Sequence, residues 1–266
     1  MTRLAAHRGG ARLWPENSLR AFRESLALGV DLLELDVHLS ADGEVVVIHD
    51  AALERTTDGR GAVVGHSAAD LRRLRLRDAD GALTGEHLPM LREVLAVVAP
   101  SHAGLLVEVK GPVAGVNVIY ERGDGDARIT GGPAYPALVE KTLALLREAA
   151  MLERVNLMGF SPDVVTETRA LAPRVPTTFL VAAAHVRSVD ARPKDAIRWG
   201  TRLGATDLGI QHTLASPEVM ATARAAGVRV GVWTVNDEEG IRRAIALGVD
   251  VLTTDRPDLA CRVLGR

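Results

Sequence analysis

Short apolar runs alternate with helical patterns along nearly the whole of this 266-residue chain. Each run has the length of a strand, and the segments between most of them are long enough for a helix, as in successive strand–helix units. Strands are predicted near Leu4–His7, Asp31–His38, Gly104–Lys110, Val155–Phe160, Thr177–Val181, Thr206–Ile210, Arg229–Val235 and Asp250–Thr254. Eight such strands favour a closed (β/α)8 barrel, and the alternative is an open doubly wound sheet.

The helical segments carry start and stop signals. Leu19, Phe22 and Leu26 are spaced as on one face of a helix over Ser18–Leu28. Asn17 is the expected N-cap of that helix, and a glycine follows its end. Two later segments repeat this shape, Pro217–Ala226 and Glu238–Leu247.

Two segments interrupt the alternation. Residues 51–88 carry turn and helix signals and are predicted to be an insertion that precedes a helix starting near Pro89. Residues 111–136 follow the third strand, with VNVIYE and DARIT flanking the turn sequence RGDG in a possible hairpin. A loop of this length is either a hinged lid over the barrel mouth or a disordered insertion. We expect residues 1–266 to form one barrel domain.

Composition excludes several classes of protein. The net charge of −2 provides no basic surface for nucleic acid, and three Trp, two Tyr and three Phe are few for base stacking. The single cysteine, Cys261, cannot form an intramolecular disulfide or a thiolate metal cluster. No apolar run has the length of a membrane span, and MTRLAAHRGG lacks the apolar core of a signal peptide. We therefore expect a cytoplasmic protein.

Glu34 and Asp36 stand two residues apart in the predicted strand 31–38. Alternate side chains of a strand point to the same face, so the two carboxylates share one face. The apolar neighbours Leu33 and Leu35 indicate a buried strand, where two carboxylates repel each other and lose hydration. A bound Mg²⁺, Ca²⁺ or Mn²⁺ would offset both costs. The alternative is a pair of ordinary salt bridges on an exposed strand edge.

Glu108 and Lys110 repeat this spacing in the third predicted strand. A lysine inside a strand indicates that a compact point charge is needed there. The alternative is a buried Glu–Lys ion pair, and such pairs are weak evidence for stability. The pattern therefore favours a functional site.

His7 ends the first predicted strand, and His49 ends the apolar run 45–48. A barrel gathers the C-terminal ends of its strands at one mouth, so both histidines would meet the carboxylates there. Two imidazoles beside a metal can serve as general base and general acid, and Arg8 and Lys110 could hold a phosphate. These groups together predict phosphoryl chemistry. The alternative for each histidine alone is a core or surface residue.

The other histidines are weaker candidates. His212 follows a predicted strand and could reach the mouth. The remaining ones have turn-like or exposed-looking contexts and are expected to be solvated: His38, His66, His87 and His102.

The motifs of this chain, in their order, resemble the glycerophosphodiester phosphodiesterase family. They are HRGG (7–10), PENS (15–18), ELDVHLSADGEVVVIHD (34–50), RTTDGRG (55–61), EVK (108–110), VWTVND (232–237) and LGVDVLTTDRP (247–257). They cover both ends and most of the chain, and only their combination is specific. The segment after Lys110 is longer than the family pattern.

The resemblance implies a (β/α)8 barrel with a small insertion after His49, which agrees with the strand count. It also implies a role for each matching position. Glu34, Asp36 and Glu108 would bind a divalent metal, and His7 and His49 would be the acid/base pair. Arg8 would contact the phosphate, Lys110 would support the phosphate or the metal, and Trp233 would line the substrate pocket.

The implied reaction is the hydrolysis of a glycerophosphodiester to glycerol 3-phosphate and an alcohol. The glycerol 2-hydroxyl would attack phosphorus to give a cyclic phosphodiester, which water then opens. His7 would be the base of the first step, and His49 would protonate the leaving alcohol. One alternative is lysophospholipase D-like hydrolysis of lysophospholipids. Another is a barrel that binds a phosphate ligand without catalysis, although that reading expects the loss of a histidine or carboxylate.

Overall fold

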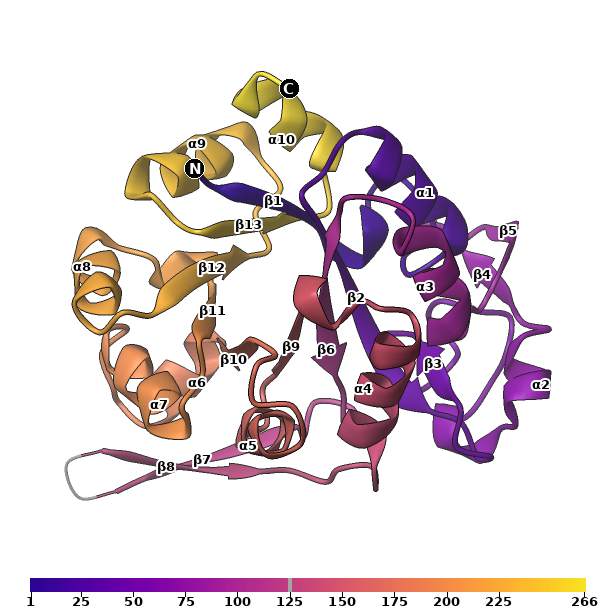
Figure 1. Ribbon diagram of the computed structural model, residues 1–266, viewed down its shortest axis with the longest axis horizontal. Coiled ribbons are helices and arrows are strands. Elements are labelled where there is room, and N and C mark those ends of the chain that lie inside the picture. The colour runs from indigo at the N-terminus through magenta and orange to yellow at the C-terminus, as the bar shows by residue number, and fades with distance from the viewer. Residues whose placement is uncertain (124–125) are drawn as a thin grey trace.

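The computed structural model describes residues 1–123 and 126–266, and it contains a closed ring of eight parallel strands (Figure 1). Hydrogen bonding follows the order β1-β13-β12-β11-β10-β9-β6-β2, and β1 pairs with β2 to close the ring. The ring strands are β1 (Arg3–Ala6), β2 (Leu32–Leu39), β6 (Gly104–Val109), β9 (Val155–Gly159), β10 (Thr177–Val181), β11 (Asp207–Gln211), β12 (Arg229–Trp233) and β13 (Val251–Thr254). The predicted (β/α)8 barrel is confirmed, and every ring strand lies within two residues of its predicted bounds.

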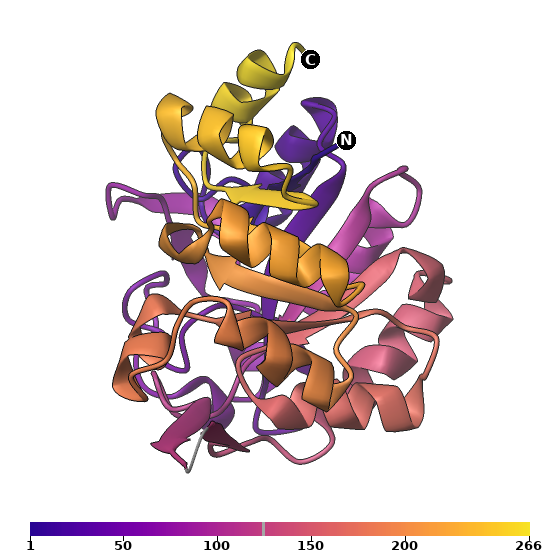
Figure 2. The ribbon, with the colours of Figure 1, turned by 90° about the vertical axis from the view of Figure 1, so that its left-hand side faces the viewer.

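Helices cover the outside of the ring. Figure 2 shows α8 and α9 lying over the outer face of the strands, and Figure 1 shows the other main helices placed around the ring. They are α1 (Leu19–Ala27), α3 (Leu91–Val98), α4 (Leu138–Glu148), α5 (Pro162–Leu171), α6 (Ala183–Ser188), α7 (Asp195–Leu203), α8 (Pro217–Ala225), α9 (Glu238–Leu247) and α10 (Pro257–Leu264). Short 3-10 helices span His7–Gly9, Val63–Gly65, Leu152–Arg154 and His212–Leu214. Among the described residues, none of these helices is both long and apolar enough to cross a membrane.

The first helix corrects one prediction. Ser18, not Asn17, is the N-cap of α1, because its hydroxyl accepts a hydrogen bond from the backbone N–H of Ala21 at 3.0 Å. Asn17 has a left-handed backbone (φ 59°), and its buried side chain points to Asp36 instead. The Asn17 side chain therefore contacts a residue of the functional site instead of capping the helix.

The predicted insertion is an ordered layer beside the barrel, on the right of Figure 1. β3 (Val45–Val47) pairs antiparallel with β2, and the short helix α2 (Ala68–Leu71) follows. β4 (Arg75–Arg77) and β5 (Leu83–His87) then form a two-stranded sheet. These elements enclose a small apolar core of their own, formed by Val46, Ile48, Leu53, Val63, Ala68, Leu71, Leu76, Leu88 and Met90. This core fixes the loop that carries His49.

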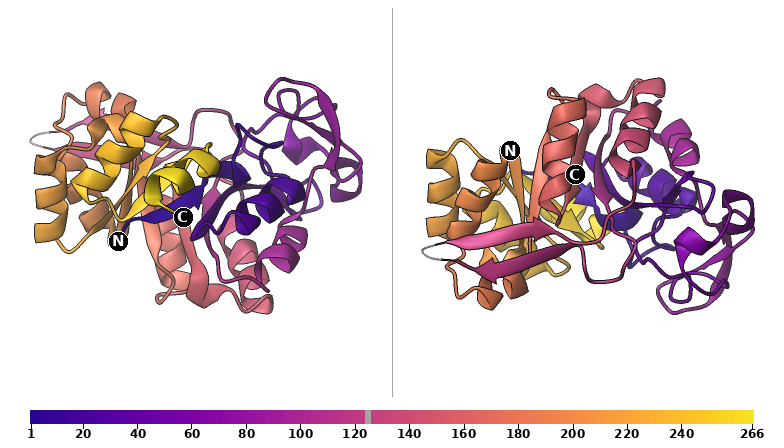
Figure 3. Two further views of the ribbon diagram at one scale, coloured as in Figure 1. Left: turned by 90° about the horizontal axis from the view of Figure 1, so that it is seen from above. Right: turned by 90° about the horizontal axis from the view of Figure 1, so that it is seen from below.

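The long segment after β6 forms the predicted hairpin. β7 (Val118–Arg122) and β8 (Ala127–Gly131) pair antiparallel, with Tyr120 opposite Ile129. Asp124 and Gly125 of the predicted turn lie outside the described residues. Figure 3 (right) shows the hairpin running alongside the orange helices, where the Tyr120 ring lies 5.4 Å from Trp199 of α7. The hairpin therefore packs against the barrel wall.

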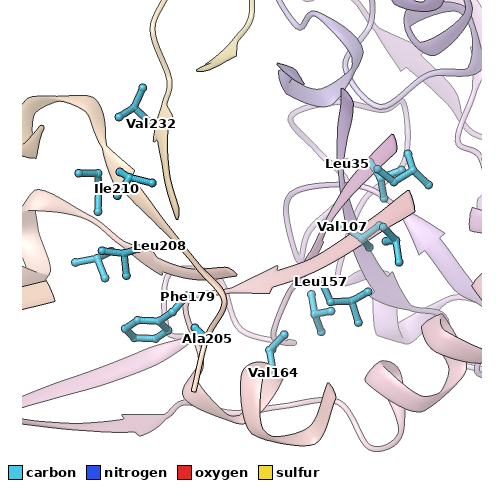
Figure 4. Packing of buried hydrophobic residues seen from close by; sticks show 14 of the residues in the cluster. Leu35, Val107, Leu157, Val164, Phe179, Ala205, Leu208, Ile210 and Val232 are labelled. Carbon is cyan, nitrogen blue, oxygen red and sulfur yellow. The ribbon is translucent and has the colours of Figure 1, made fainter. Parts of the chain in front are cut away.

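Strand alternation divides the core into two parts. Outward-facing residues pack beneath the helices, and Figure 4 shows Leu35, Val107, Leu157 and Phe179 among them. Residues of the opposite parity fill the ring itself, as Leu32, Leu106, Met158, Leu180 and Val251 do. Glu34 and Asp36 have this inward parity and are 1% and 0% exposed. The prediction that they share one buried face is confirmed by this arrangement.

Candidate active site

The first wall of the site is a tight turn at the end of β1. Arg8, Gly9 and Gly10 have φ values of 51°, 75° and 94°, all in the left-handed region. A Cβ at Gly9 would lie 2.7 Å from the Cβ of Ala21, so only glycine fits against α1 there. The turn directs the backbone N–H of Arg8 to Glu34 Oε2 at 2.9 Å. The HRGG sequence thus couples the first strand to the acidic second strand.

Three buried carboxylates meet beside this turn. Glu34 and Asp36 come from β2 and Glu108 from β6, where Asp36 pairs in register with Glu108. One oxygen from each lies within 4.8 Å of the others. Oδ1 of Asp36 is buried and has no hydrogen-bond partner among the described residues, although Lys110 Nζ lies 3.5 Å away. A group of hard, buried oxygen donors with an unsatisfied atom fits a divalent cation.

The surroundings of the cluster shift the pKa values of Glu34 and Asp36 in opposite directions. Burial raises the pKa of Glu34 well above its usual value, and the neighbouring carboxylates Asp36 and Glu108 raise it further. Burial also opposes ionisation of Asp36, but the charges of His49 and Lys110 outweigh it and lower the pKa of Asp36. A cation between them would favour the ionised form of both.

His7 lies at the C-terminal end of β1 and contacts both the acidic cluster and the opposite end of the chain. Its Nδ1 is 2.6 Å from Oδ1 of Asp255, which directly follows β13. Its Nε2 lies 3.9 Å from Oε2 of Glu34. Asn236 donates a hydrogen bond to the other oxygen of Asp255 at 2.6 Å. Asp255 thereby orients the ring so that Nε2 faces the cluster.

His49 has an equivalent arrangement. Its Nδ1 lies 2.6 Å from Oδ1 of Asp50, the next residue. Its backbone oxygen is 3.0 Å from Nε2 of His38, whose Nδ1 is 2.8 Å from the Tyr135 hydroxyl. The expectation that His38 is solvated is wrong: its side chain is buried, because it continues the inward parity of Glu34 and Asp36 along β2. Burial lowers the pKa of His38 to about 4, so it is a neutral support for the His49 loop.

An ion network connects the two histidine loops. The Arg8 guanidinium contacts Glu16 (Nη1–Oε1, 3.0 Å) and Asp36 (Nε–Oδ2, 3.3 Å). Arg55 donates to Glu16 (Nη1–Oε2, 2.8 Å) and to Asp50 (Nε–Oδ2, 2.5 Å). Arg55 belongs to the insertion, so the insertion supports the carboxylate that orients His49.

A cavity of about 180 Å³ runs from this cluster into the barrel. Most of the sequence-predicted site residues line it: His7, Arg8, Glu34, His49, Glu108 and Trp233. Two lie behind its surface. Asp36 is fully buried, and Lys110 donates a hydrogen bond to Glu108 Oε1 at 2.7 Å. The structure therefore brings all eight predicted residues to one mouth or directly behind it.

Sequence reasoning missed the residues that hold these eight in place. Asn17 donates to Asp36 Oδ2 at 3.0 Å, and Phe160 packs edge-on against Trp233 with ring centroids 5.6 Å apart. Asp50 and Asp255 orient the histidines. The position of His38 could have been predicted, because it has the same strand parity as Glu34 and Asp36. The other missed residues occupy turns or a strand end, where sequence spacing does not fix the direction of a side chain.

A ring of parallel strands with an acidic cluster between two carboxylate-bound histidines defines a barrel enzyme suited to phosphate-ester chemistry. The profile of the Glycerophosphoryl diester phosphodiesterase family matches residues 7–259. The chain belongs to this family.

Individual relatives agree over nearly the full length. The chain is 28% identical over 258 residues to a glycerophosphodiester phosphodiesterase of Caldanaerobacter subterraneus, covering 97% of this chain and 95% of the relative. It is similar to the solved glycerophosphodiester phosphodiesterase of Agrobacterium tumefaciens, with 26% identity, a TM-score of 0.76 and coverage of 98% and 100%. An Oleispira antarctica phosphodiesterase, solved with the product sn-glycerol-3-phosphate, has the same fold, with 23% identity, a TM-score of 0.79 and coverage of 100% and 98%.

Proposed function

We propose that this protein hydrolyses glycerophosphodiesters to glycerol 3-phosphate and an alcohol, with a divalent metal held by Glu34, Asp36 and Glu108. The observation that carries the proposal is the cluster of three buried carboxylates beside two histidines, each with a carboxylate at Nδ1. The family to which the chain belongs and the activity named for its relatives support this substrate class.

Each residue of the site has its own role in the proposed reaction. A metal held by Glu34, Asp36 and Glu108 would supply Lewis-acid polarisation of the phosphoryl group. Arg8 lines the cavity and Lys110 lies directly behind it, and both add positive charge near the phosphate. Trp233 with Phe160 forms an apolar wall for the glycerol carbons. His7 Nε2 accepts the proton of the glycerol 2-hydroxyl as its oxygen bonds to phosphorus. His49 Nε2 gives a proton to the leaving alcohol as its bond to phosphorus breaks, and water then opens the cyclic phosphodiester with the roles reversed.

A metal-supplemented screen tests the proposal. Purified protein is treated with chelator, dialysed and supplied with Mg²⁺, Ca²⁺ or Mn²⁺, and glycerol 3-phosphate is measured from a panel of glycerophosphodiesters. We expect no turnover after chelation and recovery with at least one metal, because three converging carboxylates require a cation. Full activity of the metal-free protein would refute the ligand assignment.

The same screen separates the alternatives. Lysophosphatidylcholine as the better substrate would favour a lysophospholipase D-like activity over the proposed one. Binding of glycerol 3-phosphate without turnover of any diester would favour a non-catalytic barrel.

A further inference from the structure

A second cavity, of about 280 Å³, opens at the mouth beside His49. Its lining includes His49 but none of the three carboxylates, and His7 is not part of it. His49 therefore stands between the cavity that contains the acidic cluster and this second cavity. If His49 protonates the alcohol that leaves phosphorus, that alcohol departs toward the second cavity.

The segment after β6 forms one wall of this cavity. Val113, Ala114 and Val118 contribute aliphatic side chains, and Phe160 and His185 from the barrel also line the cavity. His185 stacks on Tyr120 of the hairpin with centroids 4.7 Å apart and meets Phe160 edge-on at 5.4 Å. The wall is thus tied to the barrel by stacked rings.

The charged groups that border the cavity are already paired. Lys110 Nζ turns to Glu108, and the Asp50 oxygens accept from His49 and Arg55. Burial lowers the pKa of His185, which favours its neutral imidazole. The described lining therefore offers no free carboxylate to an ammonium group.

We propose that this cavity receives the leaving alcohol and accepts a quaternary ammonium headgroup, choline, in preference to a primary ammonium headgroup, ethanolamine. The inference rests on the proposed function. A primary ammonium carries three N–H donors that lose water and find no free anionic acceptor here. A trimethylammonium has no donors, packs its methyl groups on the aliphatic wall and is attracted by an aromatic ring such as Phe160.

The test compares kcat/KM for glycerophosphocholine and glycerophosphoethanolamine in the metal-loaded protein. We expect the choline ester to be favoured by about tenfold or more, since tenfold corresponds to only about 1.4 kcal/mol. Ala114→Asp places a carboxylate in the wall and should shift the ratio toward the ethanolamine ester. Val116→Asp adds the same charge to an exposed residue of the same segment that does not line the cavity, so its ratio should match the wild type.

The possible outcomes test the headgroup preference, the location of the headgroup and the proposed function separately. Equal kcat/KM values in the wild type would overturn the proposed preference. A shift of the same size in Ala114→Asp and Val116→Asp, or in neither, would overturn the location of the headgroup. Failure to hydrolyse any glycerophosphodiester with any of the three metals would overturn the proposed function and this inference with it.

Discussion

Each of the two histidines meets a carboxylate at Nδ1, which leaves Nε2 as its other ring nitrogen, and both residues line the cavity. A proton on Nδ1 that is donated to Asp255 or Asp50 makes the opposite nitrogen the one that exchanges protons in the cavity. The two rings come from loops 42 residues apart in sequence, yet their Nδ1 partners are equivalent. This equivalence suits a reaction in which one imidazole gives a proton while the other takes one.

The first prediction concerns these rings. His7→Ala and His49→Ala should each lower kcat by about 10²–10⁴, the usual contribution of a general acid or base. Metal affinity, measured by titration calorimetry, should be retained because neither ring is assigned as a ligand. His87→Ala, which removes an exposed histidine of the insertion, is the control. Near-wild-type turnover in both site variants would contradict the acid/base assignment.

The second prediction concerns Asp255 as a positioning residue. Asp255→Asn should lower kcat by about 10–10³-fold, because an amide no longer fixes the proton of His7 on Nδ1. KM and metal affinity should change little, since Asp255 is not assigned to contact substrate or metal. Asp258→Asn makes the same change at a carboxylate that pairs with Arg256 outside the site. If kcat falls equally in both variants, the loss does not come from His7.

Geometry explains why the acidic residues could be predicted from the sequence, whereas the residues that position the site could not. Strand parity alone places Glu34 and Asp36 on one face, and apolar neighbours show that this face is buried. The direction of Asn17 or Asp255 depends on a turn and on a partner distant in sequence. A contact such as His7–Asp255 has no local signature.

At the scale of elements, the hairpin β7–β8 is anchored to the barrel through Tyr120, Asp126 and Ala127. Tyr120 lies between His185 and Trp199, and Asp126 accepts from Trp199 Nε1 at 2.8 Å. Ala127 is buried in the main core. Replacing residues 116–129 by a flexible linker should therefore lower stability, because these contacts between the hairpin and the barrel would be lost. The turn sequence RGDG and its two strand-like flanks predicted the hairpin, but they did not predict that it packs against α6 and α7.

The third prediction separates the ring of Tyr120 from its hydroxyl. Tyr120→Ala should lower the free energy of unfolding by about 2–3 kcal/mol, because a partly buried ring and its stacking are lost. Tyr120→Phe should be neutral or stabilising, because the buried hydroxyl has no hydrogen-bond partner among the described residues. Denaturant titration of both variants measures the difference. Equal losses in the two variants would show that the hydroxyl has an important partner.

At the scale of the whole molecule, a metal bound at the carboxylate cluster would stabilise the folded state. The fourth prediction is that metal at about 100 times its Kd adds roughly 2.7 kcal/mol to the folded state and raises Tm by several degrees. Glu34→Gln should abolish this rise. The metal-free Tm of this variant should match the wild type, because the raised pKa of Glu34 favours an uncharged carboxyl, which the amide resembles in size and charge.

Glu44→Gln, at an exposed residue between β2 and β3, is the matched control and should keep the full shift in Tm. Calorimetric scans with and without metal provide the measurement. An undiminished shift in Glu34→Gln would remove Glu34 from the ligand set.

The barrel itself was the most predictable level of organisation, because eight apolar runs leave few closed arrangements. The antiparallel β3 and the pair β4–β5 were not predicted, since they are short and pack on a separate small core. Their existence depends on side chains that meet only after the chain folds.

The place of β1 in the ring has a consequence for protein synthesis. β1 lies between β2 and β13, and His7 meets a residue 248 positions later. A nascent chain on the ribosome acquires both histidines, all three carboxylates and Lys110 within its first 110 residues. It must nevertheless keep the edge of β1 unpaired until β13 emerges from the exit tunnel, so the enzyme cannot become active during translation of its first half.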